Sequence, residues 1–235
     1  MKLKMTLAAL AAMVAAPAMA NSPATVSELI SWEVGASYNF ATKDIINWGD
    51  ASGKKVHTLG TDVTGVYKID ANNAATLRLS YATGSASRRD SWVSADEDGF
   101  VYARGTDRMR YRLHSFTLMP GYRYTKQIDD KLSCFAGVNA GLVNASLKYK
   151  VSGDMVDNFT GAHFSYRDGS HGSEWGFAYS VELGASYAFT DKLGVFLAYQ
   201  FSGSTARPKL HGGPDSVSAA QQIYHSVRAG VSCSF

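Results

Sequence analysis

The sequence predicts an all-β fold: a single antiparallel up-and-down transmembrane β-barrel, with eight strands or, as the alternative, ten. Three observations lead to this prediction. Apolar and polar residues alternate with a period of two in segments long enough to cross a bilayer as tilted strands. Short turns and long polar stretches join these segments in alternation. After residue 20 there is no apolar run long enough for a transmembrane helix.

The first twenty residues have the pattern of a secretory signal peptide. Two lysines precede an apolar stretch that ends in the small-x-small pattern A-M-A, so cleavage is expected between Ala20 and Asn21. Residues 1–20 are therefore predicted to be the signal peptide and residues 21–235 one barrel domain. Without the two leader lysines the formal charge is close to balanced, and export argues against a nucleic-acid partner.

The clearest strand is predicted at 175–189. Its odd-numbered residues, from Trp175 to Phe189, are apolar or aromatic, whereas its even-numbered residues are small or polar. A soluble sandwich also alternates, but its bulky face fills a core. Here the small face suits the interior of a narrow barrel, and the bulky face suits lipid.

The same alternation predicts seven further strands. They lie at 30–40, 59–69, 75–82, 116–124, 134–151, 193–201 and 223–235. Within 134–151 the apolar set changes phase, from Leu142 to Ala145, Leu147 and Tyr149. This change predicts a β-bulge near Val143-Asn144.

The connections between these strands differ in length. Three are short turns, at 70–74, 125–131 and 190–192, and four are long polar stretches, at 42–55, 85–109, 152–173 and 203–220. This asymmetry is typical of bacterial outer-membrane barrels, with the short turns in the periplasm. Aromatic residues also gather near both ends of the strands, as two interfacial belts would. The predicted periplasmic belt consists of Tyr67, Tyr122, Tyr124, Tyr187, Phe189 and Phe235. The predicted outer belt consists of Phe40, Tyr81, Tyr111, Tyr149, Trp175, Phe177, Tyr199 and Phe201.

The closing segment, IYHSVRAGVSCSF, alternates to its last residue, Phe235. It resembles the C-terminal strand of outer-membrane barrels, and the chain from residue 21 resembles the small OmpA-like, OmpX-like or opacity-like barrels. The resemblance implies a location in the outer membrane of a Gram-negative envelope. It also implies that Phe235 is part of the signal read by the barrel-assembly machinery. A monomer among outer-membrane lipids and lipopolysaccharide is expected.

Five charged residues fall on the small-residue face of the predicted strands: Glu33, Asp62, Arg78, Glu182 and Arg228. The first and last strands meet when a barrel closes, so Glu33 can lie near Arg228, and Asp62 and Arg78 lie on neighbouring strands. Buried charges are costly unless they are paired. A plug of paired charges is favoured, since eight strands leave a lumen just wide enough for side chains. A gate or a narrow proton or ion path is the alternative.

The long stretch at 85–109 is the most distinctive candidate surface. Residues 91–104 are predicted to form a hairpin beyond the membrane. Its candidate interaction residues are Arg88, Arg89, Trp92, Phe100, Tyr102 and Arg104. The aromatic residues either form an adhesive edge or pack on each other, and the basic residues can bind lipopolysaccharide phosphates.

Three functions follow from these features. The first is a non-enzymatic envelope or surface-interaction role, adhesive or structural, carried by the long loops. The alternatives are a narrow porin-like channel for small solutes and an outer-membrane enzyme acting on lipid or peptide. The contents of the lumen distinguish the surface-interaction role from the channel, because a lumen filled by the inward charges excludes solute flow.

Histidines are the residues from which an enzyme would be built. In the pairs His114-Ser115 and His225-Ser226, adjacent strand residues point to opposite faces and cannot cooperate simply. A loop cluster of His163, His171, Asp168 and Glu174 could form a metal or acid-base site, but an exposed polar loop is the simpler interpretation. No catalytic residue, metal site or cofactor is predicted.

The two cysteines, Cys134 and Cys233, fall on strands that are not neighbours. Their separation around the barrel is expected to exceed the reach of a disulfide. Both are predicted to be free thiols that face lipid.

Overall fold

The computed structural model describes residues 30–44, 46–48, 51–210, 218–219 and 221–234. The predicted signal peptide and Phe235 lie outside the described residues. The chain forms β-strands throughout this part: β1 (Ile30–Ala41), β2 (Ile46–Trp48), β3 (Ala51–Lys54), β4 (Thr58–Lys68), β5 (Asn73–Ala95), β6 (Val101–Gln127), β7 (Leu132–Asp157), β8 (His163–Ala188), β9 (Leu193–Ser204), β10 (Ser218–Ala219) and β11 (Gln222–Ser234).

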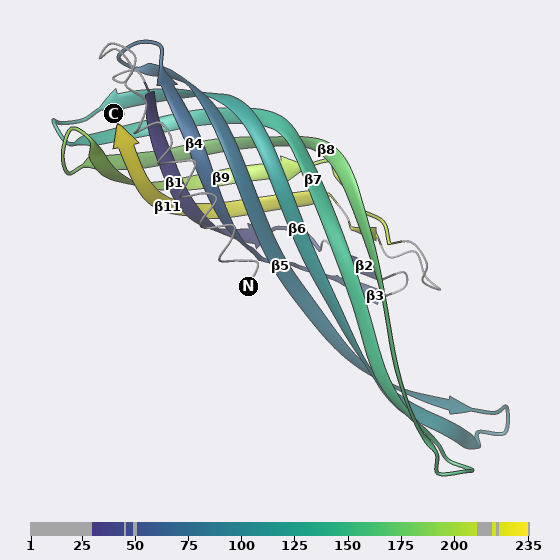
Figure 1. Cartoon of the computed structure of the whole chain (residues 1–235). Helices are drawn as coiled ribbons and strands as arrows, with labels where there is room; N and C mark the ends of the chain where they lie inside the picture. The colour runs from purple at the N-terminus through teal and green to yellow at the C-terminus, as the bar shows by residue number, and fades with distance from the viewer. Residues whose placement is uncertain (1–29, 45, 49–50, 211–217, 220, 235) are drawn as a thin grey trace, which may run out of the picture.

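Within the described residues, eight strands close into a ring in the order β1-β11-β9-β8-β7-β6-β5-β4 (Figure 1). Every neighbouring pair is antiparallel, and the ring is completed by β1 with β11, from Ser31↔Ser234 to Ala41↔Tyr224. The prediction of an eight-stranded up-and-down barrel is confirmed, and the ten-stranded alternative is wrong. A separate small sheet has the order β10-β2-β3. Closure pairs the backbone groups that an open sheet would leave at its edges.

The three short turns predicted from sequence lie together at one end of the barrel, which we call the turn end. Side-chain oxygens fold each of them back on itself. Asp70 Oδ1 accepts hydrogen bonds from the backbone of Asn72 and Asn73, both at 2.8 Å, and Asp129 Oδ1 accepts from Lys131 at 2.8 Å. Thr190 Oγ1 has the same role, with Leu193 N at 3.0 Å.

At the opposite end, four strands continue far beyond the ring (Figure 1). Pairing of β4 with β5 ends at Thr58↔Gly84, whereas β5 and β6 remain paired to Ala95↔Val101. Likewise β7 and β8 remain paired to Val156↔His163. We call residues 85–112 and 148–171 the extension. The stretches at 85–109 and 152–173 are therefore mainly strand and not loop, and the predicted hairpin at 91–104 is the tip of β5 and β6.

The predicted bulge near Val143-Asn144 is wrong. Strand β7 pairs with β8 from Leu132↔Tyr187 to Val156↔His163 without a shift in register. The inward face simply changes character near residue 143, from Gly137, Asn139 and Gly141 to Val143, Ala145 and Leu147. Leu147 is therefore buried inside the barrel wall, and its neighbour Lys148 is exposed outside.

Two residues assigned to the outer aromatic belt belong to this apolar interior. Tyr111 is almost fully buried, and the ring of Tyr149 packs on it with centroids 4.9 Å apart. The outward surface of the barrel is a band of exposed apolar side chains, among them Leu59, Leu77, Leu118, Val138, Leu142, Leu183, Leu197, Val227 and Val231. None of the described segments is a helix long and apolar enough to cross a membrane.

Candidate functional site

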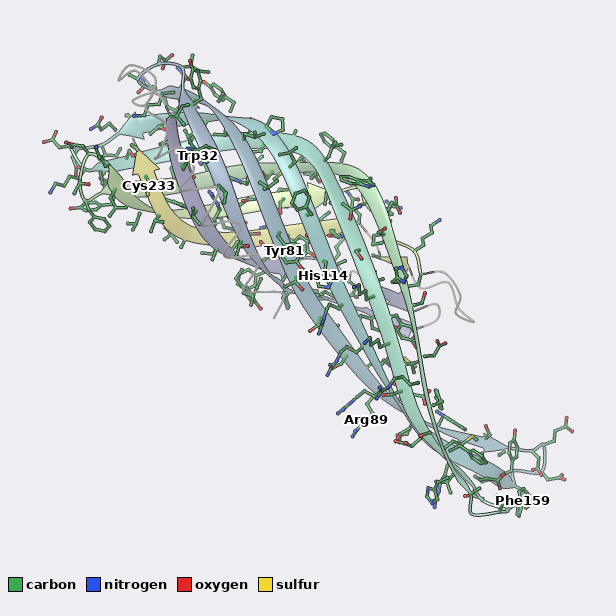
Figure 2. All side chains as sticks on the ribbon, viewed as in Figure 1. Trp32, Tyr81, Arg89, His114, Phe159 and Cys233 are labelled. Carbon is green, nitrogen blue, oxygen red and sulfur yellow. The ribbon has the colours of Figure 1, made fainter. Side chains whose placement is uncertain are left out.

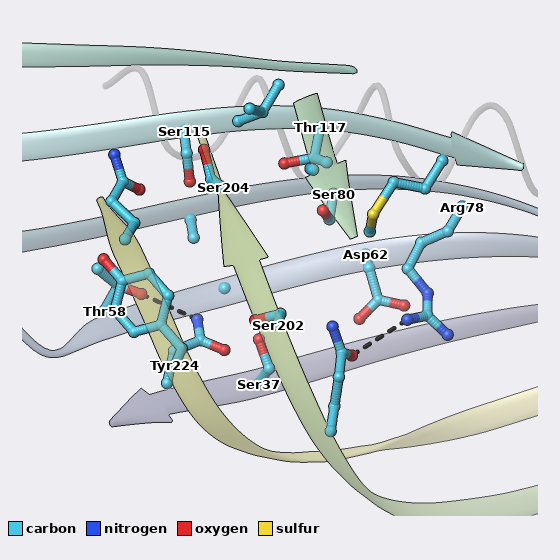
Figure 3. Close-up of a pocket in the computed structure, with 18 of the residues that line it drawn as sticks. Ser37, Thr58, Asp62, Arg78, Ser80, Ser115, Thr117, Ser202, Ser204 and Tyr224 are labelled. Atoms are coloured by element: carbon cyan, nitrogen blue, oxygen red, sulfur yellow. Dashed lines mark hydrogen bonds between the residues drawn. The ribbon is translucent and has the colours of Figure 1, made fainter. Parts of the chain in front are cut away.

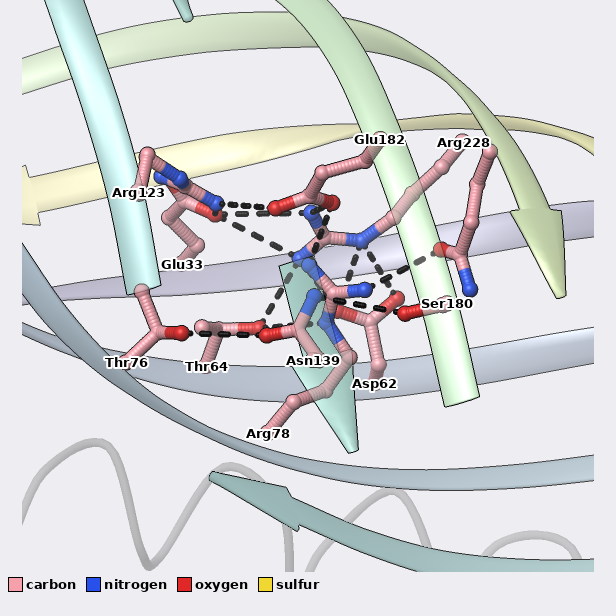
Figure 4. A network of polar contacts seen from close by, with 11 residues as sticks. Glu33, Asp62, Thr64, Thr76, Arg78, Arg123, Asn139, Ser180, Glu182 and Arg228 are labelled. Atoms are coloured by element: carbon pink, nitrogen blue, oxygen red, sulfur yellow. Dashed lines mark hydrogen bonds and ion pairs between the residues drawn. The ribbon is translucent and has the colours of Figure 1, made fainter. Parts of the chain in front are cut away.

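The five inward charges lie in one contacting cluster at the centre of the barrel (Figure 4). Each comes from a different strand: Glu33 from β1, Asp62 from β4, Arg78 from β5, Glu182 from β8 and Arg228 from β11. Alternation along each strand turns these side chains inward, and the closure of the ring brings them together. All five are at most 5 % exposed.

A sixth charge, Arg123 of β6, completes the cluster and is absent from the sequence prediction. It lies between Tyr122 and Tyr124, which both face outward, so alternation already placed it inside. Its guanidinium donates to both oxygens of Glu33, at 3.0 Å to Oε2, and to Glu182 Oε1 at 3.1 Å. Three arginines and three carboxylates therefore form a network with balanced formal charge, which we call the ionic layer.

The pairing inside the ionic layer differs in one respect from the expected contacts. Arg228 does reach Glu33, with Nη2 to Oε2 at 3.4 Å, but its main partner is Asp62, with Nε 2.9 Å from both carboxylate oxygens. Arg78 binds Glu182 at 2.5 Å rather than Asp62. Neighbouring strands bring Asp62 and Arg78 close, but the long side chain of Arg78 reaches across the lumen instead.

Further contacts hold the arginines of the ionic layer in place. Thr64 Oγ1 accepts from Arg78 Nε at 3.2 Å and from Arg228 Nη2 at 3.0 Å. On the turn-end side, the Arg123 guanidinium lies 4.3 Å above the ring of Phe135, and that of Arg228 lies 4.4 Å above Phe196. Such cation–π contacts add stabilisation when the cation is desolvated. The ionic layer thus fills the lumen at this level with paired charges, and among the described atoms of these six side chains only Arg123 Nε is buried without a hydrogen-bond partner.

Next to the ionic layer, toward the extension, lies a polar cavity of about 90 Å³ (Figure 3). Hydroxyl and amide groups line it, including Ser37, Asn39, Ser80, Thr117 and Ser202. A cavity of this size and polarity takes a few water molecules but no larger solute.

An apolar layer closes the lumen beyond this cavity. Its buried residues are Ala41, Val56, Ala86, Tyr111, Leu113, Leu147 and Ala219. Val56, Tyr111 and Leu147 are at most 1 % exposed. The lumen is therefore blocked at two separate levels, one ionic and one apolar.

Five of the six candidate surface residues of the extension divide between its two faces, and the sixth, Phe100, lies in the tip between β5 and β6. We call the face that continues the outer surface of the barrel the outer face, and the other the inner face. Alternation places Arg89, Tyr102 and Arg104 on the outer face, and Arg88 and Trp92 on the inner face. Figure 2 shows Arg89 part of the way along the extension and Phe159 at its far end.

Several of these side chains have partners within the extension. Arg88 forms an ion pair with Asp90 at 2.6 Å, and the ring of Phe100 packs against Phe159 at 5.4 Å. Asp107 Oδ1 accepts hydrogen bonds from Trp92 Nε1, at 3.2 Å, and from the Tyr166 hydroxyl. The bond to Asp107 raises the pKa of Tyr166 to about 12. Internal contacts thus order the inner face and the tip.

His57, His114 and His225 have aromatic partners. The Tyr81 hydroxyl and His114 Nδ1 are 2.7 Å apart, and His225 Nδ1 bonds to the Tyr199 hydroxyl. In the described part of the chain, no group of three histidine, cysteine or acidic residues is close enough to hold a metal ion. Both cysteines are free, as predicted: Cys134 on β7 is exposed and Cys233 on β11 is half-buried.

Comparisons with known proteins give only distant similarity. No protein-family model and no curated protein sequence matches the chain. Similar solved structures include surface protein A of Neisseria, with 13% identity, 88% of this chain and 97% of that chain covered, and a TM-score of 0.48. OprG of Pseudomonas aeruginosa has 11% identity, coverage of 88% and 95%, and a TM-score of 0.45. The outer-membrane protease OmpT of Escherichia coli has 12% identity, coverage of 88% and 96%, and a TM-score of 0.43. All three scores are below 0.5, so the barrel assignment rests on the strand pairing of this chain.

Proposed function

We propose that this protein is an integral outer-membrane barrel without enzymatic activity, whose envelope or surface-interaction role is carried by the extension. The turn end faces the periplasm and the extension projects from the cell. Support comes from the outward band of exposed apolar side chains around a closed ring. A closed barrel is one of the two architectures that satisfy the backbone in lipid.

The observation that carries this proposal is the double closure of the lumen. The ionic layer and the apolar layer are separated by the polar cavity, so a solute would have to displace both. Opening the ionic layer separates buried charges, and opening the apolar layer exposes packed rings to water. Because the lumen offers no route, the extension is the part of the molecule left to interact with other molecules.

Planar-bilayer conductance of the refolded protein tests this proposal. We expect no stable conductance from the wild type under conditions where a porin gives clear steps. The charge-balanced variant E33A/R123A opens only the ionic layer, and Y111A/L147A opens only the apolar layer, so each should remain closed. The combined variant should conduct. Steady conductance of the wild type would favour the porin-like alternative and overturn the proposal.

A further inference from the structure

A groove of about 830 Å³ crosses the outer wall where the barrel passes into the extension. It lies over β1, β4, β5, β6 and β7. Its cationic side is formed by Lys55, Arg112 and Lys148, and its apolar side includes Tyr38 and Leu59. Tyr81 and His114, labelled in Figure 2, lie between the two sides.

Within the part of the chain that the structure describes, the cations of this groove have no countercharge. Arg112 and Lys148 are direct register partners on neighbouring strands, so two positive side chains stand opposite each other. Among the described residues, no carboxylate lies within ion-pair distance of Lys55, Arg112 or Lys148. Like charges directly opposite destabilise a sheet. A bound anion would remove this repulsion.

The basic character continues along the outer face of the extension. Arg110 is the register partner of Lys150, and Arg89 that of Arg108. Arg108, Arg110, Lys150 and Arg167 line a second hollow of about 330 Å³. By strand alternation, the acidic residues Asp90, Asp107 and Asp168 lie on the inner face instead, whereas Asp154, nearer the tip, lies on the outer face. The outer face therefore presents several positive charges together next to the barrel.

The height of the groove fits the phosphates of a lipid bilayer. Arg112 lies four residues beyond Phe116 on β6, and Phe116 is an exposed aromatic residue in the row that also contains Tyr81. Four residues span about 13 Å along a strand. At the usual barrel tilt this is about 10 Å along the membrane normal, beyond the aromatic belt and at the level of the headgroups.

We propose that this groove binds the phosphate groups of a phosphorylated glycolipid in the outer leaflet. Arg112, Lys148 and Lys55 bind the phosphates, and the apolar side receives the upper part of the acyl chains. Leu59 supports a lipid rather than a soluble anion, because it is 63 % exposed on the wall directly below the cations. The inference rests on the membrane orientation given under Proposed function and names the partner of the outer face.

Lipid retention measured by native mass spectrometry tests the inference. The full chain without its predicted signal peptide is refolded into phosphatidylcholine nanodiscs that contain either bisphosphorylated lipid A or its dephosphorylated form. We expect the wild type to retain the phosphorylated lipid about tenfold more than the dephosphorylated one. R112E/K148E should lose about tenfold of this retention, and R112Q/K148Q about threefold. The matched control K68E/K126E reverses two exposed cations at the turn end and should retain lipid as the wild type does.

Each contrary outcome identifies what is wrong. Equal retention by the wild type and both folded groove variants overturns the inference, and the glutamine variant serves if the glutamate variant does not fold. Displacement of the lipid by millimolar inorganic phosphate would show a site for free anions and overturn the assignment to lipid. If the barrel folds, does not conduct and retains both forms of lipid A equally, only this inference is overturned. A conducting barrel overturns the proposed function instead.

Discussion

Glu182 is the residue on which the ionic layer converges. Its carboxylate lies 2.5 Å from Arg78, 3.1 Å from Arg123 and 3.6 Å from Arg228. Replacing it leaves three buried arginines with only two carboxylates. Removing one partner from a buried ionic network is far more destabilising than replacing the whole network with apolar residues. Glu182 is therefore expected to be the most sensitive position in the lumen.

The substitution E182A should lower the free energy of unfolding by about 3–5 kcal/mol. Urea unfolding in lipid vesicles, followed by tryptophan fluorescence, measures this change. The control E97A removes an exposed glutamate at the tip of the extension and should change it by less than about 0.5 kcal/mol. A loss for E182A no larger than that of the control would show that the arginines find other partners.

The turn residue Asp129 is expected to respond to acid. Backbone hydrogen bonds from Lys131 and Leu132 lower the pKa of this exposed carboxyl from its ordinary value of 3.8. Because the pKa is lower in the folded than in the unfolded state, these hydrogen bonds stabilise the turn fully at pH values above the unfolded pKa of about 4. The stabilisation is lost as the pH falls through the folded-state pKa. NMR titration should place the midpoint of Asp129 below 3.8, and amide exchange at Leu132 should accelerate only below it.

The control for this turn is D129N, which keeps a side-chain acceptor but does not titrate. Its amide exchange at Leu132 should be independent of acid over the same range, apart from intrinsic exchange. An Asp129 midpoint at or above the ordinary value would contradict the role of these hydrogen bonds.

Arg123 shows what residue-level sequence reasoning can reach. The alternation of Tyr122 and Tyr124 places Arg123 inside, so the sequence carries the signal for this residue although it was not among the five predicted charges. The ion-pair partners of each arginine, in contrast, could not be predicted from the sequence, because an arginine side chain can cross a narrow lumen. Which carboxylate it meets depends on the relative heights of strands that are not adjacent, and no local pattern carries that information.

At the scale of elements, β7 is the strand that the sequence pattern misrepresented. Its apolar residues move from the outward to the inward positions near residue 143, and the strand itself keeps its register. A change in hydrophobic phase predicts a bulge only if the same side of the strand stays apolar. Here the environment changes: from residue 146 to residue 154 the outward positions are polar, and the interior becomes an apolar layer.

Cysteine accessibility distinguishes the continuous strand from a bulged one. In a C134S/C233S background, Cys at position 148 should react readily with a water-soluble maleimide. Cys at position 147 should react about tenfold more slowly or less, because Leu147 is fully buried. A bulge at 143–144 would reverse the two rates, so faster labelling at position 147 would contradict the structure.

The extension is built from the same strands as the barrel wall, but it depends on different contacts. Its strands are held by pairing among β5, β6, β7 and β8 and by contacts such as that of Trp92 with Asp107. Glycines in the left-handed conformation, Gly99 and Gly161, lie at its two hairpin tips, where an L side chain would be strained. The sequence predicted long polar connections here, because strands that are rich in charged residues and pair only with each other have the same composition as loops.

At the scale of the whole molecule, the barrel should fold without the extension. The ring of eight strands closes below the row formed by Ser87, Arg110, Lys150 and Gly169, which are register partners across the four strands. Deleting 88–109 and 151–168, with an Asn-Gly turn at each junction, retains the ionic layer and most of the apolar layer.

We expect this shortened protein to keep the heat-modifiable gel mobility of a folded barrel and a free energy of unfolding within about 2 kcal/mol of the full chain. A variant that deletes only the turn 128–131 is the control, since it breaks a connection inside the ring and should prevent folding. Failure of the shortened protein to fold would mean that the extension helps the barrel to close.

The sequence by itself determined the class of fold and the inward position of five of the six lumen charges, and it favoured eight strands over ten. These follow from alternation with a period of two and from turn-forming residues, which are local properties of the backbone. Only the tertiary structure decided which charges pair, where apolar residues close the lumen, and that the long polar stretches are paired strands. It also brought Lys55, Arg112 and Lys148 to one groove. These features depend on contacts between distant segments, which closure of the ring brings to the same height.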